Sequence, residues 1–328
     1  MLMRKALSVL LLSTAMMLTP CMFPQMQAAT SAEPVRPDAV VLTANPIDLG
    51  SASSEIAAPQ TVRQLAERMI RTLVDQPDFA CWKEASAAYY PLGPGLHSWL
   101  VLLNCQEAPS GYLIITAVPD GGYVVSQYGT GPEVPYSQAV LRRSLAAFPA
   151  FNRASDKLLS LHITAVYADP LLPYWEVRNA EGERLFLDAM DGSMLPDQKN
   201  WPASPPTPTV SHMLGSRNFG NKMEAVSRNY QSFADPYSDL TWMHSKPIPA
   251  SGTSPAVLQR LLDHHPSLVF QVSGANLRYQ APFAVQGYHK YTLDTNLTPA
   301  VYLDIGRKTF VPLAVLQASQ GSWQYKPN

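Results

Sequence analysis

Short apolar runs, each bounded by proline or glycine, are the feature that most constrains the fold of this chain. Residues 99–103 (WLVLL) and 112–116 (YLIIT) are such runs. Runs of about five apolar or β-branched residues between turn signals are typical of β-strands. Residues 120–122 (DGG) predict a tight turn, and residues 123–128 (YVVSQY) supply its second strand. The sequence therefore predicts an antiparallel β-meander.

A helix is predicted ahead of this meander. Apolar residues recur at helical spacing up to residue 76, and Pro77 ends the pattern. Thr61 and Gln64 match a capping box at the helix start. The apolar positions are Val62, Leu65, Met69, Ile70 and Leu73. They give the helix one apolar face to bury.

Further elements complete a first domain with an α+β fold. Strands are expected from Trp82 onward, and residues 137–148 have a helical pattern. Three more strands are predicted at residues 163–167, 174–178 and 184–189, linked by turns at residues 169–170 and 181–182. Helix, meander and these strands together predict an α+β domain.

A proline-rich segment separates this domain from a second one. Residues 196–208 contain five prolines, four of them within residues 202–208 beside Ser and Thr, which is typical of an extended, semi-rigid linker. After it, residues 223–230 are predicted to be helical. Thr253 or Ser254 precedes Pro255, the pattern of an N-cap followed by proline at the first helical position. Strands are predicted at residues 268–272, 283–288, 300–304 and 309–312.

The first 32 residues have the layout of a secretory signal peptide. Arg4 and Lys5 precede an apolar run from residue 6 to residue 18, and small residues cluster at 28–32. The run is shorter than the roughly 20 residues of a transmembrane helix, so cleavage and secretion are expected. Residues 18–21 (LTPC) also match a bacterial lipoprotein box, which would anchor the protein to a membrane through a lipid on Cys21.

Removal of the signal peptide leaves an even pair of cysteines. Of the three cysteines, Cys21 lies in the signal peptide, and Cys81 and Cys105 remain. In an oxidising compartment the simplest outcome is one disulfide, which closes a loop of about 25 residues. The alternative is a reactive thiol, against which stands the absence of a C-x-x-C spacing.

The charge content argues against nucleic acid as a partner. The formal net charge is -1 and 15% of residues are charged, so the chain lacks the basic stripe that binds phosphate backbones. The 30 prolines restrict the unfolded chain, which suits an exposed, secreted protein.

The first domain resembles two families of secreted Gram-positive proteins. Residues 111–117 (GYLIITA), 122–125 (GYVV) and 128–129 (YG) are similar to the propeptide-type domains that precede cysteine-peptidase-like domains. Residues 174–178 (YWEVR), with 187–189 and 191–192, are similar to the closing hairpin of PepSY-type domains. The resemblance covers residues 60–198 and implies a domain that covers or regulates a neighbour.

The second domain resembles the second half of the papain-like C39 peptidases. The resemblance covers residues 254–316, where a helix, a strand, the strand ending in Gly287-Tyr288 and a hairpin follow in order. The family places a Cys nucleophile on a helix, a His at the start of the Gly-Tyr strand and an Asp or Asn on the next strand. Here no cysteine follows Cys105, the His position falls on Pro282 or Phe283, and Asp304 alone matches. The resemblance therefore implies a pseudoenzyme.

No other catalytic motif stands out in the linear sequence. The chain lacks G-x-S-x-G, S-x-x-K, H-E-x-x-H, P-loop and G-x-G-x-x-G patterns, and no cofactor or metal is predicted. A spatially assembled hydrolase site would need His289 and Asp304, with Asp294 or Asp239. His289 follows the Gly-Tyr strand end and is the best single site candidate, although a surface histidine is the more ordinary interpretation.

The loop at residues 235–242, ahead of the helix that begins at Pro255, is the best binding candidate. It carries Asp235, Tyr237, Asp239 and Trp242, a set able to hold a sugar or peptide by stacking. The ordinary interpretation is a turn whose Asp side chains bond local amides. His264 and His265 are expected to cap a helix C-terminus, with metal binding as the alternative. Trp99 and Trp175 are expected in the core.

The sequence as a whole favours a secreted, non-catalytic α+β protein of two domains. The predicted parts are a signal peptide (1–32), a flexible lead-in (33–59), a propeptide/PepSY-like domain (60–198), a linker (199–210) and a degenerate C39-like domain (211–328). The expected partner is peptide or cell-envelope material. The alternatives are an active hydrolase around His289 and Asp304, and a protease inhibitor of the propeptide type.

Overall fold

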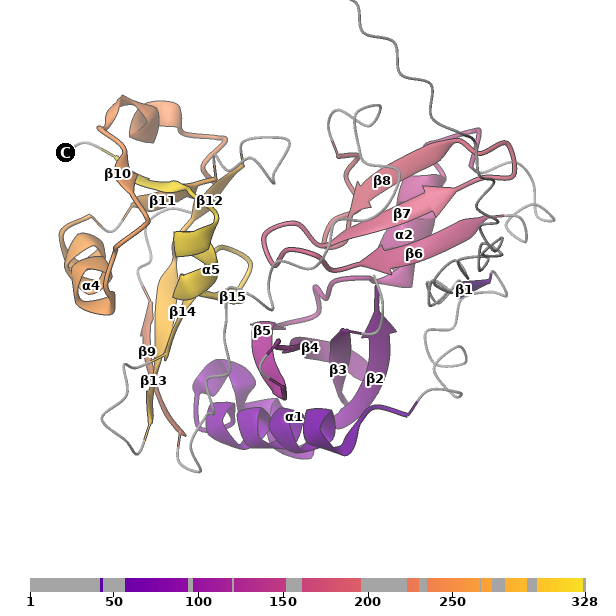
Figure 1. Cartoon of the computed structure of the whole chain (residues 1–328), viewed down its shortest axis with the longest axis horizontal. Helices are drawn as coiled ribbons and strands as arrows, with labels where there is room; N and C mark the ends of the chain where they lie inside the picture. Colours follow the sequence, from indigo (N-terminus) through magenta and orange to yellow (C-terminus); the bar gives the residue numbers. More distant parts are fainter. Residues whose placement is uncertain are drawn as a thin grey trace, which may run out of the picture. The chain divides into compact units, whose positions relative to one another are not determined.

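The computed structural model describes residues 42–43, 57–93, 97–119, 121–151, 161–195, 223–229, 235–265, 267–272, 281–293 and 300–326 (Figure 1). The predicted signal peptide and the predicted linker lie outside these residues, as does all of the lead-in except residues 42–43 and 57–59. Cys21, His212 and Asp294 also lie outside them. The described chain is a mixed α+β fold with mostly antiparallel sheets.

The first part of the chain forms a helix followed by an antiparallel meander, as predicted. Helix α1 (Gln60–Leu73) is followed by the 3-10 helix η2 (Pro77–Glu84). The meander consists of β2 (Ser86–Leu92), β3 (Ser98–Cys105), β4 (Ala108–Ala117) and β5 (Tyr123–Thr130). The predicted apolar face of α1 is buried through Val62, Leu65, Ala66, Met69 and Leu73, and α1 contacts β4 and β5.

A four-stranded sheet follows the meander. After α2 (Gln138–Leu145), strands β6 (His162–Val166), β7 (Tyr174–Arg178) and β8 (Arg184–Asp188) pair in sequence order, within a residue of the predicted bounds. Strand β1 (Leu42–Thr43) pairs with β6 at the edge. Trp99 and Trp175 are both buried, so their predicted place in the core is confirmed.

The last third of the chain contains two groups of strands. One sheet has the order β10-β16-β11-β12, made of Ile248–Pro249, Ser322–Tyr325, Leu268–Gln271 and Pro282–Ala284. The other group comprises β9 (Met223–Asn229), β13 (Gly287–Leu293), β14 (Ala300–Asp304) and β15 (Thr309–Pro312). The remaining elements are η5 (Leu240–His244), α4 (Pro255–His264) and α5 (Leu313–Ala318).

One eight-stranded antiparallel sheet contains strands from both predicted domains. Its order is β2-β3-β4-β5-β15-β14-β13-β9. The junction is β5 with β15, where Thr309 pairs with Gly129 and Phe310 pairs with Tyr128. The two predicted domains thus share a backbone ladder, and residues 38–328 form one compact unit.

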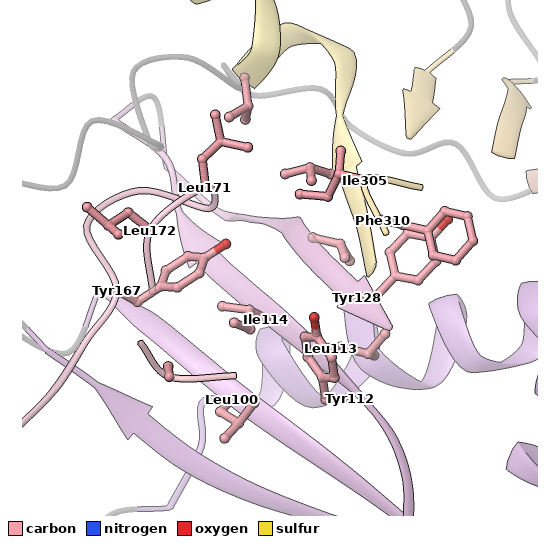
Figure 2. Close-up of a cluster of buried hydrophobic side chains, with 14 of the residues drawn as sticks. Leu100, Tyr112, Leu113, Ile114, Tyr128, Tyr167, Leu171, Leu172, Ile305 and Phe310 are labelled. Carbon is pink, nitrogen blue, oxygen red and sulfur yellow. The ribbon is translucent and has the colours of Figure 1, made fainter. Parts of the chain in front are cut away.

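Aromatic side chains pack across this junction. The Tyr128 and Phe310 rings are stacked with their centroids 4.9 Å apart, and Figure 2 shows both rings within the buried cluster that also contains Tyr112 and Ile114. The Tyr302 hydroxyl donates to the Val125 carbonyl at 2.6 Å, and so ties β14 to β5 as well. Because stacked and edge-to-face rings add roughly 0.5–1.5 kcal/mol each beyond their buried area, these side chains reinforce a short stretch of pairing.

Two glycines of the propeptide-like motif are explained by close packing beside this junction. A Cβ at Gly111 would overlap the Trp82 ring and lie 2.6 Å from the Gly129 carbonyl oxygen. A Cβ at Gly129 would lie 2.6 Å from the Tyr112 ring and 3.1 Å from the carbonyl oxygen of Lys308, the residue just before β15. Both positions therefore need glycine for close approach of ring and backbone.

Four local predictions are wrong. The single strand predicted at residues 283–288 is two strands, since β12 ends at Ala284 and β13 begins at Gly287. Residues 223–229 form β9, because their pairing with β13 along seven register positions outweighs a weak local helical preference. No side chain caps α1, whose N-cap is Pro59, so the capping box from Thr61 to Gln64 does not form. Trp82 lies in η2, which starts with Pro77, and the first strand begins at Ser86. By contrast, Ser254 caps α4 as predicted, since its Oγ accepts from Val257 N–H at 3.2 Å.

The predicted disulfide between Cys81 and Cys105 is present and joins η2 to the end of β3. The two cysteines are 24 positions apart, and on the chain-entropy model a loop of this size stabilises the fold by roughly 3 kcal/mol.

We expect the double variant C81A/C105A to lose about 3 kcal/mol of unfolding free energy because its unfolded chain is less restricted. Urea denaturation of both proteins tests this.

The matched control for that prediction is the unmodified protein in a reductant. It should unfold at the same urea concentration as the double variant, since both lack the cross-link. A double variant as stable as the oxidised protein would contradict the prediction.

Candidate functional site

The positions singled out by the C39 resemblance lie on β12 and at the end of β14. Pro282 and Phe283, at the family's His position, are in β12. Asp304 ends β14, where its Oδ1 accepts from the Gly306 N–H at 2.9 Å and so fixes the turn to β15. Burial raises the pKa of the Asp304 carboxyl to about 6. This hydrogen bond explains Asp304 as a turn-forming residue, without assigning it a catalytic role.

His289 lies inside the aromatic core on β13. Its side chain is 3% exposed, so the expectation of a surface histidine is wrong. Its Nδ1 is 2.7 Å from the Tyr128 hydroxyl, which is 2.6 Å from the Tyr291 hydroxyl. The imidazole stacks on Phe310 with the centroids 4.1 Å apart. Burial lowers the pKa of His289 to about 4, so the ring is neutral at pH 7.

Strand register brings His289 and Asp304 to one face of the sheet. His289 pairs with Tyr302, and Gly287 pairs with Asp304, so the two titratable residues belong to the same alternating set. Within the described part of the chain, Tyr128 is the one side chain hydrogen-bonded to the His289 ring. Burial also raises the pKa of Tyr128 well above 10, so it stays a neutral hydroxyl. Cys-His peptidases need a nucleophile that the histidine activates. The neutral Tyr128 hydroxyl bonded to His289 is not such a nucleophile.

Asp239 is held in a different place and a different role. Its Oδ1 accepts from the Thr241 N–H at 3.0 Å and from the Thr241 hydroxyl at 2.6 Å, which caps η5. Its Oδ2 is 2.9 Å from the Lys326 Nζ. Hydrogen bonds from Thr241 and Lys326 lower the pKa of Asp239 below its usual range. Asp239 therefore remains ionised and serves as a cap.

The proposed binding loop is an ordered turn. Asp235 Oδ1 accepts from the Tyr237 N–H at 2.9 Å, the local bonding expected of a turn. Trp242 is 3% exposed and donates from Nε1 to the Pro236 carbonyl at 2.8 Å. Its indole supports the loop from beneath and is not available for stacking on a ligand. Tyr237, in contrast, is 65% exposed.

Exposed apolar side chains gather on this loop and η5. Tyr237, Leu240 and Met243 are each more than half exposed, and we call them the apolar patch. Leu240 and Met243 lie three residues apart in a 3-10 helix, so they are on the same side of it. Leu240 and Met243 were missed at the sequence level, although the three-residue spacing after Tyr237 carried the signal.

Hydrogen bonds fix the end of η5 to the sheet. Ser245 Oγ accepts from the Tyr325 N–H at 3.1 Å and donates to the Trp242 carbonyl at 2.9 Å. The contact with Tyr325 ties the segment to β16, whereas the contact with Trp242 closes the C-terminal end of η5. The apolar patch is therefore displayed on a rigid support, which lowers the entropy lost when a partner binds.

Of the paired histidines at the end of α4, the His264 side chain caps the helix as predicted, whereas the His265 side chain packs on β16. His264 Nδ1 lies 2.7 Å from the Arg260 carbonyl oxygen, and His265 stacks on Tyr325 with the centroids 3.7 Å apart. In the residues that the structure describes, no three His, Cys, Asp or Glu side chains are grouped as metal ligands. Over the same residues, no helix has the length and apolar character needed to cross a membrane.

Comparisons with known proteins give no family for this chain. No family model matches it, and neither a curated protein nor a solved structure does. An assignment of function therefore has to rest on the residues and their geometry alone.

The buried His289 and Asp304 predict opposite pH dependences of stability. Between pH 4 and 6.5 the unfolded state binds a proton at His289 that the folded state excludes, so this residue makes stability rise with pH by about 3 kcal/mol. Between pH 3.8 and 6 the folded state holds a proton at Asp304 that the unfolded state releases, so Asp304 makes stability fall with pH by about 3 kcal/mol. Most of the two effects cancels in the native protein.

Single variants separate the two effects. Relative to the double variant H289F/D304N, D304N should gain about 3 kcal/mol of unfolding free energy from pH 4 to pH 6.5. H289F should lose about 3 kcal/mol from pH 4 to pH 6 on the same scale. Urea denaturation at half-unit pH steps measures both slopes. Parallel curves for the two single variants would contradict the prediction.

Proposed function

We propose that this chain is a secreted, non-catalytic protein that binds apolar peptide segments through the apolar patch. The observation that carries the proposal is the state of the position that a C39 peptidase would use as a base. That position is Pro282 or Phe283, on β12. His289 lies on the next strand, β13, and is buried in the core against Tyr128 and Phe310. A chain that resembles a C39 peptidase but lacks its thiolate and its base is expected to bind peptide rather than cleave it.

The apolar patch supports a binding role. Large apolar side chains that stand exposed together on a rigid surface mark interaction sites, and Tyr and Met are enriched at such sites. Tyr237, Leu240 and Met243 meet that description, and their support is fixed to β16 through Ser245. Secretion is supported by the disulfide between Cys81 and Cys105, which persists in oxidising compartments.

The experiment uses peptides of a tryptic casein digest and the purified protein with its disulfide intact. Immobilised protein should retain peptides rich in aliphatic and aromatic residues, and mass spectrometry should find no new peptide ends. The variant Y237S/L240S should lose most of this retention, because it removes two of the three apolar side chains. The variant H244S is the matched control, since His244 is an exposed residue of the same η5.

Other outcomes separate the competing functions. New peptide ends that disappear in H289F would favour the hydrolase alternative and overturn the proposal. A second arm measures casein cleavage by papain in the presence of the protein. Slower cleavage that does not depend on Tyr237 and Leu240 would favour the inhibitor alternative.

A further inference from the structure

A small pocket lies between the start of α4 and the strands β13 and β14. Its volume is about 260 Å³. Tyr288, Lys290 and Val301 line it from the strands, and residues at the start of α4 complete the lining. The helix residues at the pocket are Ser254, Pro255, Ala256, Leu258 and Gln259. It shares no residue with the apolar patch.

Lys290 is the one charged residue that lines this pocket. It is half-buried, and it makes no ion pair or side-chain hydrogen bond with any residue in the described part of the chain. An ammonium group in a partly desolvated wall attracts an anion more strongly than one in water does. The pocket is therefore complementary to a ligand with one negative charge.

The rest of the lining is mainly apolar. Leu258, Tyr288 and Val301 are buried, so the pocket wall beside Lys290 is formed by aliphatic and aromatic surface. The volume is below the roughly 300–1,000 Å³ of pockets that hold drug-sized ligands, so the pocket suits the end of a chain better than a whole peptide. A ligand that fits carries a carboxylate directly beside a compact aliphatic group.

We propose that this pocket binds an aliphatic carboxylate, namely the carboxyl-terminal residue of a peptide. The terminal carboxylate lies at Lys290, and the last side chain lies against Leu258 and Val301. The first turn of α4 adds a partial positive charge of the same sign as Lys290. The specificity is for peptides that end in Leu, Ile or Val, with little demand on preceding residues because they lie outside the pocket.

The test measures fluorescence anisotropy of a fluorescein-labelled Gly-Ser-Gly-Ser-Leu peptide, as the free acid and as the carboxyl-terminal amide. The acid should bind at least about tenfold more tightly, the size of one charge-assisted hydrogen bond. K290Q should weaken binding of the acid about tenfold and bring acid and amide to equal affinity, because the charge is gone. K290R should keep the preference for the acid. K246Q is the matched control, since Lys246 is an exposed lysine that does not line the pocket.

A second variant fills the cavity without changing its charge. Ala256 is exposed at the pocket rim, so A256W should fold normally and abolish binding of the acid. Equal affinity of acid and amide for the native protein, or unchanged binding by A256W, overturns the proposal. Hexanoate that binds as tightly as the peptide overturns the peptide assignment. Because Y237S/L240S leaves this pocket intact, it should bind the acid normally, so this inference and the proposed function fail separately.

Discussion

The stack of Tyr128 on Phe310 is the interaction on which the rest of the fold depends. Strands β5 and β15 pair at two register positions only, yet this pairing joins four strands from each half of the chain into one sheet. Two paired positions are a weak connection compared with the three to eight between the other neighbouring strands of this sheet. The ring stack and the bond from Tyr302 to Val125 therefore supply much of the cohesion.

His289 shows how this junction excludes the chemistry that the family resemblance would suggest. A charged imidazole between Phe310 and Tyr128 would lose its hydration, and burial accordingly favours the neutral ring. Its hydrogen bond to Tyr128 satisfies one nitrogen and orients the phenol toward Tyr291. The same contacts that stabilise the shared sheet thus keep the one histidine of β13 out of contact with solvent, and Asp304 holds the turn to β15.

Local patterns predicted the elements well, and long-range pairing accounts for what they missed. The strands around residues 99–103, 112–116 and 123–128 were predictable because apolar runs between Pro and Gly leave few other structures. Strand β9 was not, since its conformation is imposed by β13, which begins 58 residues after β9 ends. The burial of His289 follows from alternation with Tyr291 on one face, but which face is covered depends on the junction with β5. The turn bonds of Asp235 were predictable from residue type, whereas the burial of Trp242 depended on packing.

The two-residue period of β13 separates the buried side of the strand from the side that lines the proposed binding pocket. His289 and Tyr291 point to the aromatic side of the sheet, where they bond to Tyr128, and the alternating residues Tyr288 and Lys290 line the pocket beside α4. A change at Lys290 therefore alters the pocket without touching the Tyr128–Phe310 stack. A change at His289 acts first on the sheet. Because neighbouring residues of a strand do not share surroundings, the burial of His289 on one face leaves the other face open to the proposed ligand.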